Sequence, residues 1–304
     1  MPEVDWDTHI RSLFFQKSGE HAIVGGNTGT GKTQTLFHMV ANLAAYHKKE
    51  TIIWFDVGKS SEILRLADFK PVNVFIPEGA KLDILYNEGM EKYDSRITKK
   101  YYVSFKTFLH DIERDKINVI CIKPYEIGAD DYATKISAFF KTLIQEATSY
   151  RLEKKVPLAL IFDEMHWIAP GHGHALNEAH TDASKDVQMN IDTLRSFQIR
   201  FIGATQNWTK IRAGVRDACG WIFIKRGLTF TKQDEWKLSQ FNAKWQALPT
   251  EYVVVAFPNR NFSDDLKLPF YGNGEKIGRV YYIQDSEPQP EEPQVQMEIE
   301  KGYA

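Results

Sequence analysis

A short glycine-rich run near the amino terminus constrains this chain more than any other feature. The run reads GGNTGTGKTQ and spans residues 25–34. The residues before it, 21–24, read as a short buried strand, and residues 33–48 after it carry apolar side chains at the helical period. The glycines therefore lie on a strand-to-helix turn, where backbone that tolerates positive φ adjoins the unpaired N–H groups of a helix amino terminus. Such a turn is suited to bind an anion.

The spacing in this run matches the phosphate-loop pattern G-x-x-x-x-G-K-[ST]. In this pattern the backbone amides hold the phosphates, the lysine reaches the β and γ groups, and the last hydroxyl binds Mg²⁺. The sequence therefore predicts a nucleoside triphosphate and Mg²⁺ as ligands. The nucleotide-binding residues that we expect are Gly26, Asn27, Thr28, Gly29, Thr30, Gly31, Lys32, Thr33 and Gln34, with Thr33 also at the metal.

Length and patterning predict an α/β fold. The 304 residues, 43% of them hydrophobic, can bury one large core or two modest ones. Short runs that are mostly apolar on both faces alternate with helical stretches such as 131–152, which is typical of a largely parallel sheet with helices on both faces. The predicted strands are 51–56, 72–76, 117–122, 158–162, 200–204, 221–225 and 251–256. We expect one domain over 1–285, with a helical insertion at about 89–115 and a terminal hairpin within 266–283.

The ends and the cysteines limit the class of protein further. Residues 286–304 are rich in Pro, Gln and Glu and carry a net charge of −4, which leaves +2 on the remainder. We expect this segment to be a disordered acidic tail or a docking arm. The chain contains neither a run of 18 apolar residues nor a signal-peptide pattern, so we expect a cytoplasmic protein, or one in a host cytoplasm if it is viral. Cys121 and Cys219 have no metal-binding spacing and are predicted core thiols.

Two further blocks supply chemistry that suits a triphosphate. The run PLALIFDEMHWIAP, residues 157–170, reads as a buried strand that ends on Asp163 and Glu164. Beside a phosphate loop, the aspartate is expected to help hold Mg²⁺ and the glutamate to take a proton from the attacking water. The run LRSFQIRFIGATQNW, residues 194–208, reads as another apolar strand, after which Gln206 can touch the γ-phosphate or the water.

Together and in this order, these three blocks resemble the HerA/FtsK superfamily of DNA-pumping ATPases. The run FDVGKSSEIL, residues 55–64, is similar to that family's aspartate-ended second strand, and the resemblance covers roughly residues 20–260. It implies a RecA-like core, ATP hydrolysis and a homo-hexameric ring that threads double-stranded DNA. It also implies that Glu164 is the general base, Gln206 the sensor, and Asp163 a support for the metal.

The resemblance leaves two arginines and the task of the protein open. Arg195 and Arg226 match family positions for sensing or for a finger that reaches a neighbouring subunit, and either is alternatively a surface arginine. Only some twenty residues precede the phosphate loop, so we expect a stand-alone motor for viral genome packaging or plasmid transfer. A nuclease, a capsid protein or transfer machinery would be further partners. The alternatives are a secretion or phage-assembly motor acting on protein, and an ATP-gated switch without translocation; a small-molecule kinase is the weakest option.

Two segments are candidates for contact with DNA. The predicted loop over 171–186 holds Lys185 and three histidines, His172, His174 and His180. We expect these three histidines to be solvated loop residues, and the alternative is that they form a metal site. The stretch 96–106 interleaves basic and aromatic residues, which fits either a solvated amphipathic helix or a nucleic-acid surface.

Overall fold

The computed structural model describes residues 10–56, 60–122, 129–232, 238–259 and 261–284. The described strands form a ten-stranded sheet in the order β11-β10-β9-β1-β8-β7-β2-β6-β3-β5 and a two-stranded sheet, β12-β4. In the sheet order just given, every neighbouring pair of strands from β9 to β5 is parallel. Strand β10 pairs antiparallel with β9, and β11 pairs antiparallel with β10. The bounds are β1 Ala22–Gly25, β2 Thr51–Asp56, β3 Val72–Pro77, β4 Ala80–Tyr86, β5 Ile97–Tyr102, β6 Ile117–Cys121, β7 Leu158–Phe162, β8 Ile199–Thr205, β9 Trp221–Ile224, β10 Tyr252–Ala256, β11 Leu266–Lys267 and β12 Gly278–Gln284.

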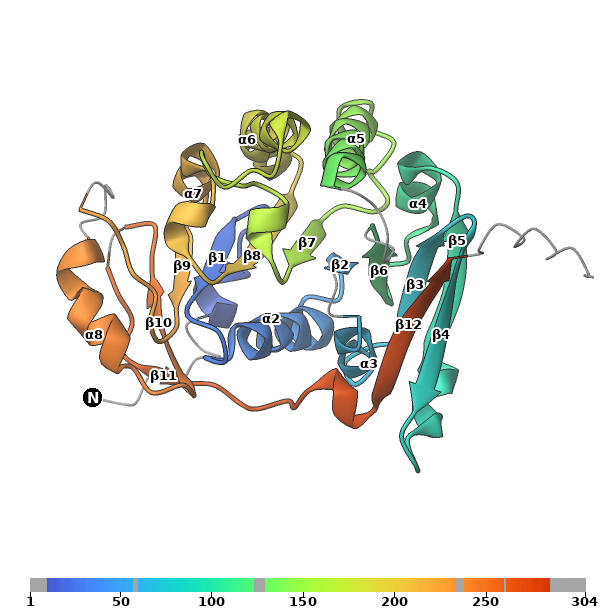
Figure 1. Cartoon of the computed structure of the whole chain (residues 1–304), viewed down its shortest axis with the longest axis horizontal. Helices are drawn as coiled ribbons and strands as arrows, with labels where there is room; N and C mark the ends of the chain where they lie inside the picture. The colour runs from blue at the N-terminus through green and yellow to red at the C-terminus, as the bar shows by residue number, and fades with distance from the viewer. Residues whose placement is uncertain (1–9, 57–59, 123–128, 233–237, 260, 285–304) are drawn as a thin grey trace, which may run out of the picture.

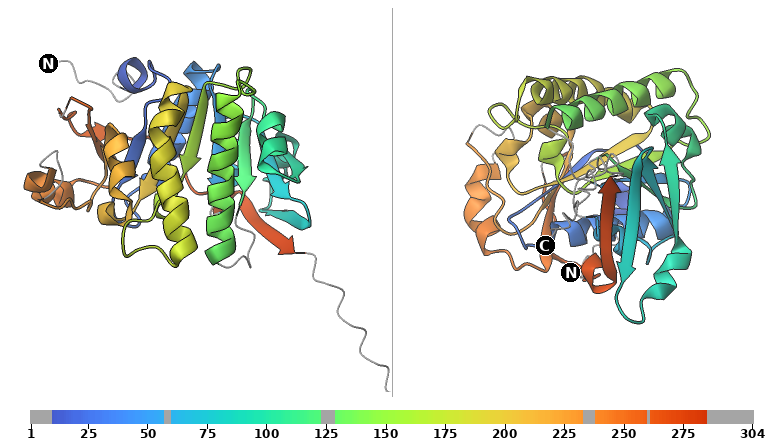
Figure 2. Two further views of the ribbon diagram at one scale, coloured as in Figure 1. Left: turned by 90° about the horizontal axis from the view of Figure 1, so that it is seen from above. Right: turned by 45° about the vertical axis from the view of Figure 1, so that its right-hand side comes forward.

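Helices cover both faces of the large sheet, which confirms the predicted fold class (Figure 1). The α-helices are α2 Lys32–Tyr46, α3 Glu62–Leu66, α4 Phe105–Asp111, α5 Ala129–Thr148, α6 Glu178–Ser196, α7 Ala213–Ala218 and α8 Asn242–Ala247. The described residues also form a π-helix, η1 Ile10–Phe14, and 3-10 helices, η2 Glu91–Arg96, η3 Met165–Trp167, η4 Trp208–Lys210, η5 Leu238–Phe241 and η6 Gly274–Lys276. Helices α4, α5, α6 and α7 lie on one face, and α2 and α3 on the other. Figure 2 shows α5 and α6 running side by side across the first face.

Each face of the sheet has its own apolar core. Residues of α5 such as Phe139 and Phe140 pack with Phe162 and Phe201 from the strands on one face. On the other face, side chains of α2 pack with different residues of the same strands. Because the central strands are buried on both sides, they are apolar at nearly every position, as their sequences indicated. Both cysteines are buried, as predicted.

A buried arginine ties the amino-terminal segment to the sheet. Arg200, the second residue of β8, is fully buried, and its Nε donates to Glu50 Oε1 at 2.8 Å. Its other nitrogens donate to the carbonyl oxygens of Phe14 at 3.1 Å and Lys17 at 2.9 Å. A buried charge is tolerated only when it is paired and hydrogen-bonded in this way. These contacts lie at the amino end of β8, opposite the strand ends that carry the expected site.

Two local predictions were wrong. The segment 89–115 is not a helical insertion, because it contains η2, the edge strand β5 and only the short α4. Strand β5 pairs with β3 on one side only and is exposed at Thr98, Lys99 and Tyr101, so its basic and aromatic residues belong to an edge strand. The predicted hairpin within 266–283 is also absent from the described residues: β11 pairs with β10, whereas β12 pairs with the distant β4. Figure 2 shows β12 lying beside β4. The predicted acidic tail, 286–304, lies outside the described residues.

Candidate functional site

Three neighbouring strands bring the predicted site together. Strand β8 lies between β1 and β7, and all three run parallel. The carboxyl ends of parallel strands meet at one edge of a sheet, which is where ligands bind in open α/β sheets. Gly25 at the end of β1 pairs with Thr205 at the end of β8, and Phe162 at the end of β7 pairs with Gly203. The phosphate loop, residues 26–33, therefore begins beside Gln206 and close to Asp163 and Glu164.

The loop has the backbone geometry that its glycines permit. Gly29 and Gly31 have φ of 74° and 86°, in the left-handed region that side chains disfavour. Gly31 is also the amino-terminal cap of α2, so the free N–H groups of the first helical turn face the loop. At Gly26 the constraint is space, since a Cβ there would lie 2.5 Å from Lys225 Cβ. This arrangement makes a cradle for an anion at the helix amino terminus.

Lys32 is the first residue of α2, and its ammonium group lies within the phosphate loop. Its side chain is buried, with 6% exposed, and its Nζ donates to the carbonyl oxygen of Asn27 at 2.9 Å. The same oxygen accepts a 2.7 Å hydrogen bond from Thr30 Oγ1. The ammonium group is thus held inside the loop by a neutral acceptor. A phosphate oxygen, which is itself charged, would be a stronger partner for it.

Asp163 and Thr33 face each other at the edge of the cradle. Thr33 Oγ1 lies 3.1 Å from both carboxylate oxygens of Asp163, which is 2% exposed. Hydroxyl and carboxylate oxygens are the ligands that Mg²⁺ prefers, and its remaining positions are usually filled by water and substrate phosphates. These two side chains therefore fit the predicted metal. Among the residues that the structure describes, no group of three His, Cys, Asp or Glu side chains is placed to hold a metal by itself.

Glu164 is linked to the phosphate loop through Gln206. Gln206 Nε2 donates to Glu164 Oε1 at 3.2 Å, and Thr28 Oγ1 donates to Gln206 Oε1 at 3.0 Å. His166 Nδ1 lies 3.3 Å from the second oxygen, Glu164 Oε2. Glu164 is 8% exposed, and the hydrogen bond from Gln206 orients its carboxylate, whereas the His166 contact is one of proximity without a hydrogen bond. Such a group can accept a proton from a water molecule within hydrogen-bond distance.

The two candidate arginines lie at opposite edges of the sheet. The carbonyl oxygen of Arg226 accepts from Asn27 N at 3.0 Å, so Arg226 adjoins its own phosphate loop, and its side chain is exposed. Arg195 precedes β8 and pairs with Glu20 at 2.8 Å. The seven residues of β8 separate it from Gln206 by roughly 20 Å. Arg195 therefore cannot reach the site of its own chain.

The predicted loop 171–186 is shorter than expected, because α6 begins at Glu178. His180 lies on α6 and is buried, so the prediction of a solvated loop histidine was wrong for this residue. Its Nε2 lies 3.1 Å from the carbonyl oxygen of Trp167. Its Nδ1 accepts a hydrogen bond from Leu176 N at 3.4 Å. Burial lowers the pKa of His180. His172 and His174 are exposed. Because His180 is turned into the fold, the three histidines do not form the alternative metal site.

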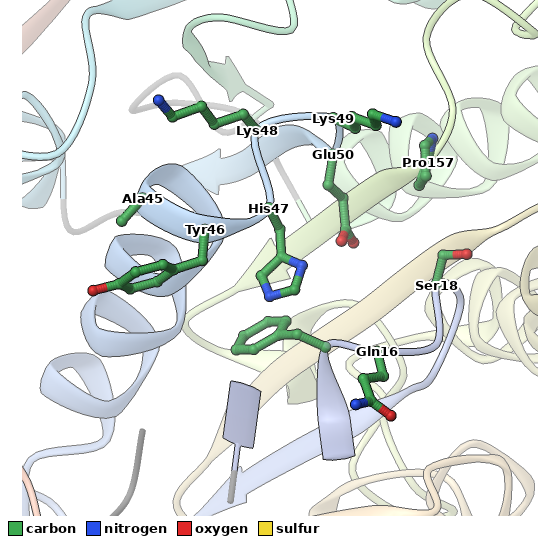
Figure 3. A pocket seen from close by; sticks show the side chains of 10 residues that line it. Gln16, Ser18, Ala45, Tyr46, His47, Lys48, Lys49, Glu50 and Pro157 are labelled. Carbon is green, nitrogen blue, oxygen red and sulfur yellow. The ribbon is translucent and has the colours of Figure 1, made fainter. Parts of the chain in front are cut away.

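A cavity of 580 Å³ lies away from the edge that carries the phosphate loop. It is bordered by the carboxyl end of α2 and the residues just before β2. Figure 3 shows the ammonium groups of Lys48 and Lys49 directed away from each other, while the carboxylate of Glu50 points inward. Glu50 is already paired with Arg200. This cavity therefore lacks the converging donors of a phosphate site.

The structure also reveals residues that the sequence did not assign. His166 was visible in the D-E-x-H pattern, but its contact with Glu164 was not predicted. Lys225 lies next to Arg226 and is buried. Its Nζ donates to the backbone carbonyl oxygens of Thr250 at 2.6 Å and Tyr252 at 2.7 Å. Burial lowers the pKa of Lys225 to about 8. The side chain of Gln34, whose predicted role in nucleotide binding stays a prediction, is hydrogen-bonded to the backbone of the distant Tyr271 and Gly272.

Fold and site together define an α/β protein with a phosphate-loop nucleotide site. No protein-family model and no curated protein matches the chain. Many solved structures resemble it, among them the following three. One is the genome packaging NTPase B204 of Sulfolobus turreted icosahedral virus 2 in complex with sulfate, 15% identical over 83% of this chain and 97% of that chain, with a TM-score of 0.49.

The second is B204, the DNA-packaging ATPase of Sulfolobus turreted icosahedral virus, 16% identical over 84% of this chain and 100% of that chain, with a TM-score of 0.46. The third holds ATPases 2 and 3 of Thermomonospora curvata EccC with a signal sequence peptide, 14% identical over 84% of this chain and 39% of that chain, with a TM-score of 0.42. No helix among the described residues combines the length and the apolar character needed to span a membrane.

Proposed function

We propose that the chain is an ATPase that moves double-stranded DNA, acting as a homo-hexameric ring in viral genome packaging or plasmid transfer. The observation that carries the ATPase part is the meeting of Lys32, Asp163 and Glu164 at one sheet edge, with Gln206 joining Glu164 to the phosphate loop. The DNA part rests on the motifs that resemble the HerA/FtsK superfamily. The proposed place of action is the cytoplasm, or that of a host.

Each side chain has a defined part in the proposed hydrolysis. The amides of the phosphate loop and Lys32 bind the phosphates, and Thr33 and Asp163 would hold Mg²⁺, which neutralises charge on the phosphate oxygens. Glu164 accepts a proton from the water that attacks the terminal phosphorus, and the bond from that phosphorus to the bridging oxygen of ADP breaks. Gln206 contacts both Thr28 and Glu164, so it can report the loss of the γ-phosphate to β8.

The proposed ring would grip mainly DNA phosphates, in part through the region 171–186, which comprises the segment before α6 and the beginning of α6. Lys185, in the second turn of α6, pairs with Asp182 at 2.7 Å, and both side chains are more than half exposed. A DNA phosphate can compete for that ammonium group. We predict that Lys185→Ala lowers the ratio of the ATPase rates with and without double-stranded DNA. It should also reduce the salt dependence of binding, by a slope of about 0.9 for one lost phosphate contact.

The experiment measures steady-state phosphate release at several salt concentrations for the wild type, Lys185→Ala and the control Lys154→Ala. Lys154 is exposed and lies before the amino end of β7, away from the site. The proposal expects DNA to raise the wild-type rate whatever its base sequence, since phosphate contacts carry no sequence information. A wild-type rate that ignores DNA would contradict the DNA proposal and favour the protein motor or the switch. An unchanged response in Lys185→Ala alone would place the grip elsewhere, with the segment 96–106 as the next candidate.

A further inference from the structure

The position of the acids determines which way a bound nucleotide must point. Glu164 and Gln206 follow β7 and β8, which lie on one side of β1. Strands β9 and β10 lie on the other side of β1. A triphosphate whose terminal group faces Glu164 therefore extends along the phosphate loop with its nucleoside directed toward β9 and β10. This direction follows from the strand order.

A pocket lies where the nucleoside would emerge. It has a volume of 160 Å³ and lies between Gly29–Gly31 of the phosphate loop and Leu268–Phe270, the segment that follows β11. Thr250 and Glu251, just before β10, line it as well. Leu268 is 7% exposed, whereas Phe270 is 74% exposed. The pocket thus offers an apolar wall that ends in an exposed aromatic ring.

The wall belongs to a segment that is fixed to the phosphate-loop helix. We call residues 268–272 the strap; Figure 1 shows it on the path from β11 toward α3 and β12, passing α2. Tyr271 N donates to Gln34 Oε1 at 2.7 Å, and Gln34 Nε2 donates to the oxygen of Gly272 at 2.9 Å. Tyr271 Oη lies 2.6 Å from Nδ1 of His38, one helical turn further along α2. Gln34 follows Thr33 directly, so the strap is positioned by the same turn that faces the phosphates.

The polar groups near the pocket leave the apolar wall as its main recognition surface. Lys225 Nζ donates hydrogen bonds to the backbone carbonyl oxygens of Thr250 and Tyr252. The same nitrogen would lie 3.6 Å from a Cβ placed at Gly31. At that distance a Cβ would be in ordinary van der Waals contact, so the constraint at Gly31 is its positive φ of 86° rather than space. A planar, weakly polar ring is the ligand that fits beside Leu268, Pro269 and Phe270. A nucleobase stacks favourably on such an aromatic side chain.

We propose that this pocket receives the nucleoside part of the nucleotide, with Phe270 stacking on the base and Gln34 positioning the strap. The inference rests on the proposed binding of a nucleoside triphosphate by the phosphate loop. It assigns a binding role to a segment more than 230 residues away in sequence from that loop. It also assigns Gln34 to the nucleoside side of the site rather than to the phosphates.

The test compares a ligand that has a base with one that has none. Calorimetric titrations of ATP and of inorganic tripolyphosphate, both with Mg²⁺, are made on the wild type, Phe270→Ala, Phe270→Trp and the control Tyr150→Ala. Tyr150 is 71% exposed and lies between α5 and β7, at the opposite ends of the strands from the pocket. We expect Phe270→Ala to weaken ATP binding by about 10- to 100-fold, the scale of one lost stacking contact. Its affinity for tripolyphosphate should not change, and Phe270→Trp should bind ATP like the wild type.

Two results separate a failure of this inference from a failure of the proposed function. If Phe270→Ala binds ATP as tightly as the wild type, or the wild type binds both ligands equally, the base does not lie against the strap and the inference is overturned. If the wild type binds neither ATP nor tripolyphosphate, the phosphate site itself is contradicted, and the nucleoside pocket with it. Loss of both ligands in Phe270→Ala would also overturn the inference, because it would give the ring a structural role.

Discussion

Replacing Glu164 with glutamine is expected to lower ATP turnover by about a hundredfold or more while ATP binding is retained. The amide keeps the size of the side chain, but it cannot accept the proton of the attacking water. Asp163, Lys32 and the backbone of the phosphate loop, which would bind the nucleotide, are unchanged by this substitution. Phosphate release measured beside ATP affinity by calorimetry separates the two effects.

The matched control is Glu153→Gln, which removes an equal charge from an exposed position before β7 and should leave turnover unchanged. Turnover near the wild-type rate in Glu164→Gln would show that another group activates the water. His166, whose Nδ1 lies 3.3 Å from Glu164 Oε2, would be the next group to test.

Replacing Lys32 with alanine is expected to give the opposite pattern, because its ammonium group lies inside the loop rather than beside the water. Loss of one charge-assisted hydrogen bond to a phosphate should weaken ATP binding by about 10- to 100-fold. Lys48→Ala, at an exposed position just beyond the far end of α2, is the control. Unchanged ATP affinity in Lys32→Ala would mean that the loop does not hold the phosphates.

Arg226→Ala carries the other large expected effect. An arginine that reaches the transferring phosphate of a neighbouring subunit contributes roughly 10³- to 10⁵-fold to the rate. The backbone of Arg226 adjoins the phosphate loop and its side chain is exposed, whereas Arg195 is paired with Glu20 at the opposite ends of the strands. We therefore expect Arg226→Ala to be nearly inactive and Arg195→Ala to lose less.

Mixing variants tests whether Arg226 acts between subunits. Inactive Arg226→Ala combined with inactive Lys32→Ala should recover part of the activity, because some interfaces in a mixed ring join an intact loop to an intact arginine. No recovery, despite subunit exchange shown by mass measurement of mixed assemblies, would mean that Arg226 acts within its own chain. Recovery with Arg195→Ala instead would transfer the role to Arg195.

The sequence predicted the central fold because the signals there are local. Strands β1, β2, β7 and β8 are short apolar runs bounded by turns, and their expected positions agree with the structure to within one or two residues. The edges were harder to predict, because their pairing depends on distant partners. Strand β12 pairs with β4 from the other end of the chain, and no nearby residue specifies that contact. The edge strand β5 likewise lies in the segment that was predicted to be a helical insertion.

The site shows the same division. The phosphate loop, Asp163, Glu164 and Gln206 were assigned from motifs, and the structure places these residues at one edge, as expected from parallel strand ends. Their chemical roles remain predictions. The strap was not predictable, because Leu268–Gly272 has no motif and meets Gln34 only through the tertiary fold. The burial of His180 was missed for the same reason, since its partner Trp167 is brought to it by the turn before α6.

Displacement of a triplex-forming oligonucleotide from double-stranded DNA tests the central claim most directly, because only a motor that travels along the duplex removes the third strand. The measurement uses the full chain with ATP and Mg²⁺, and Glu164→Gln as the reference that binds ATP without hydrolysing it. The account predicts that the wild type displaces the third strand at a rate that rises with ATP, and that Glu164→Gln does not. ATP hydrolysis by the wild type with the triplex left intact would contradict it.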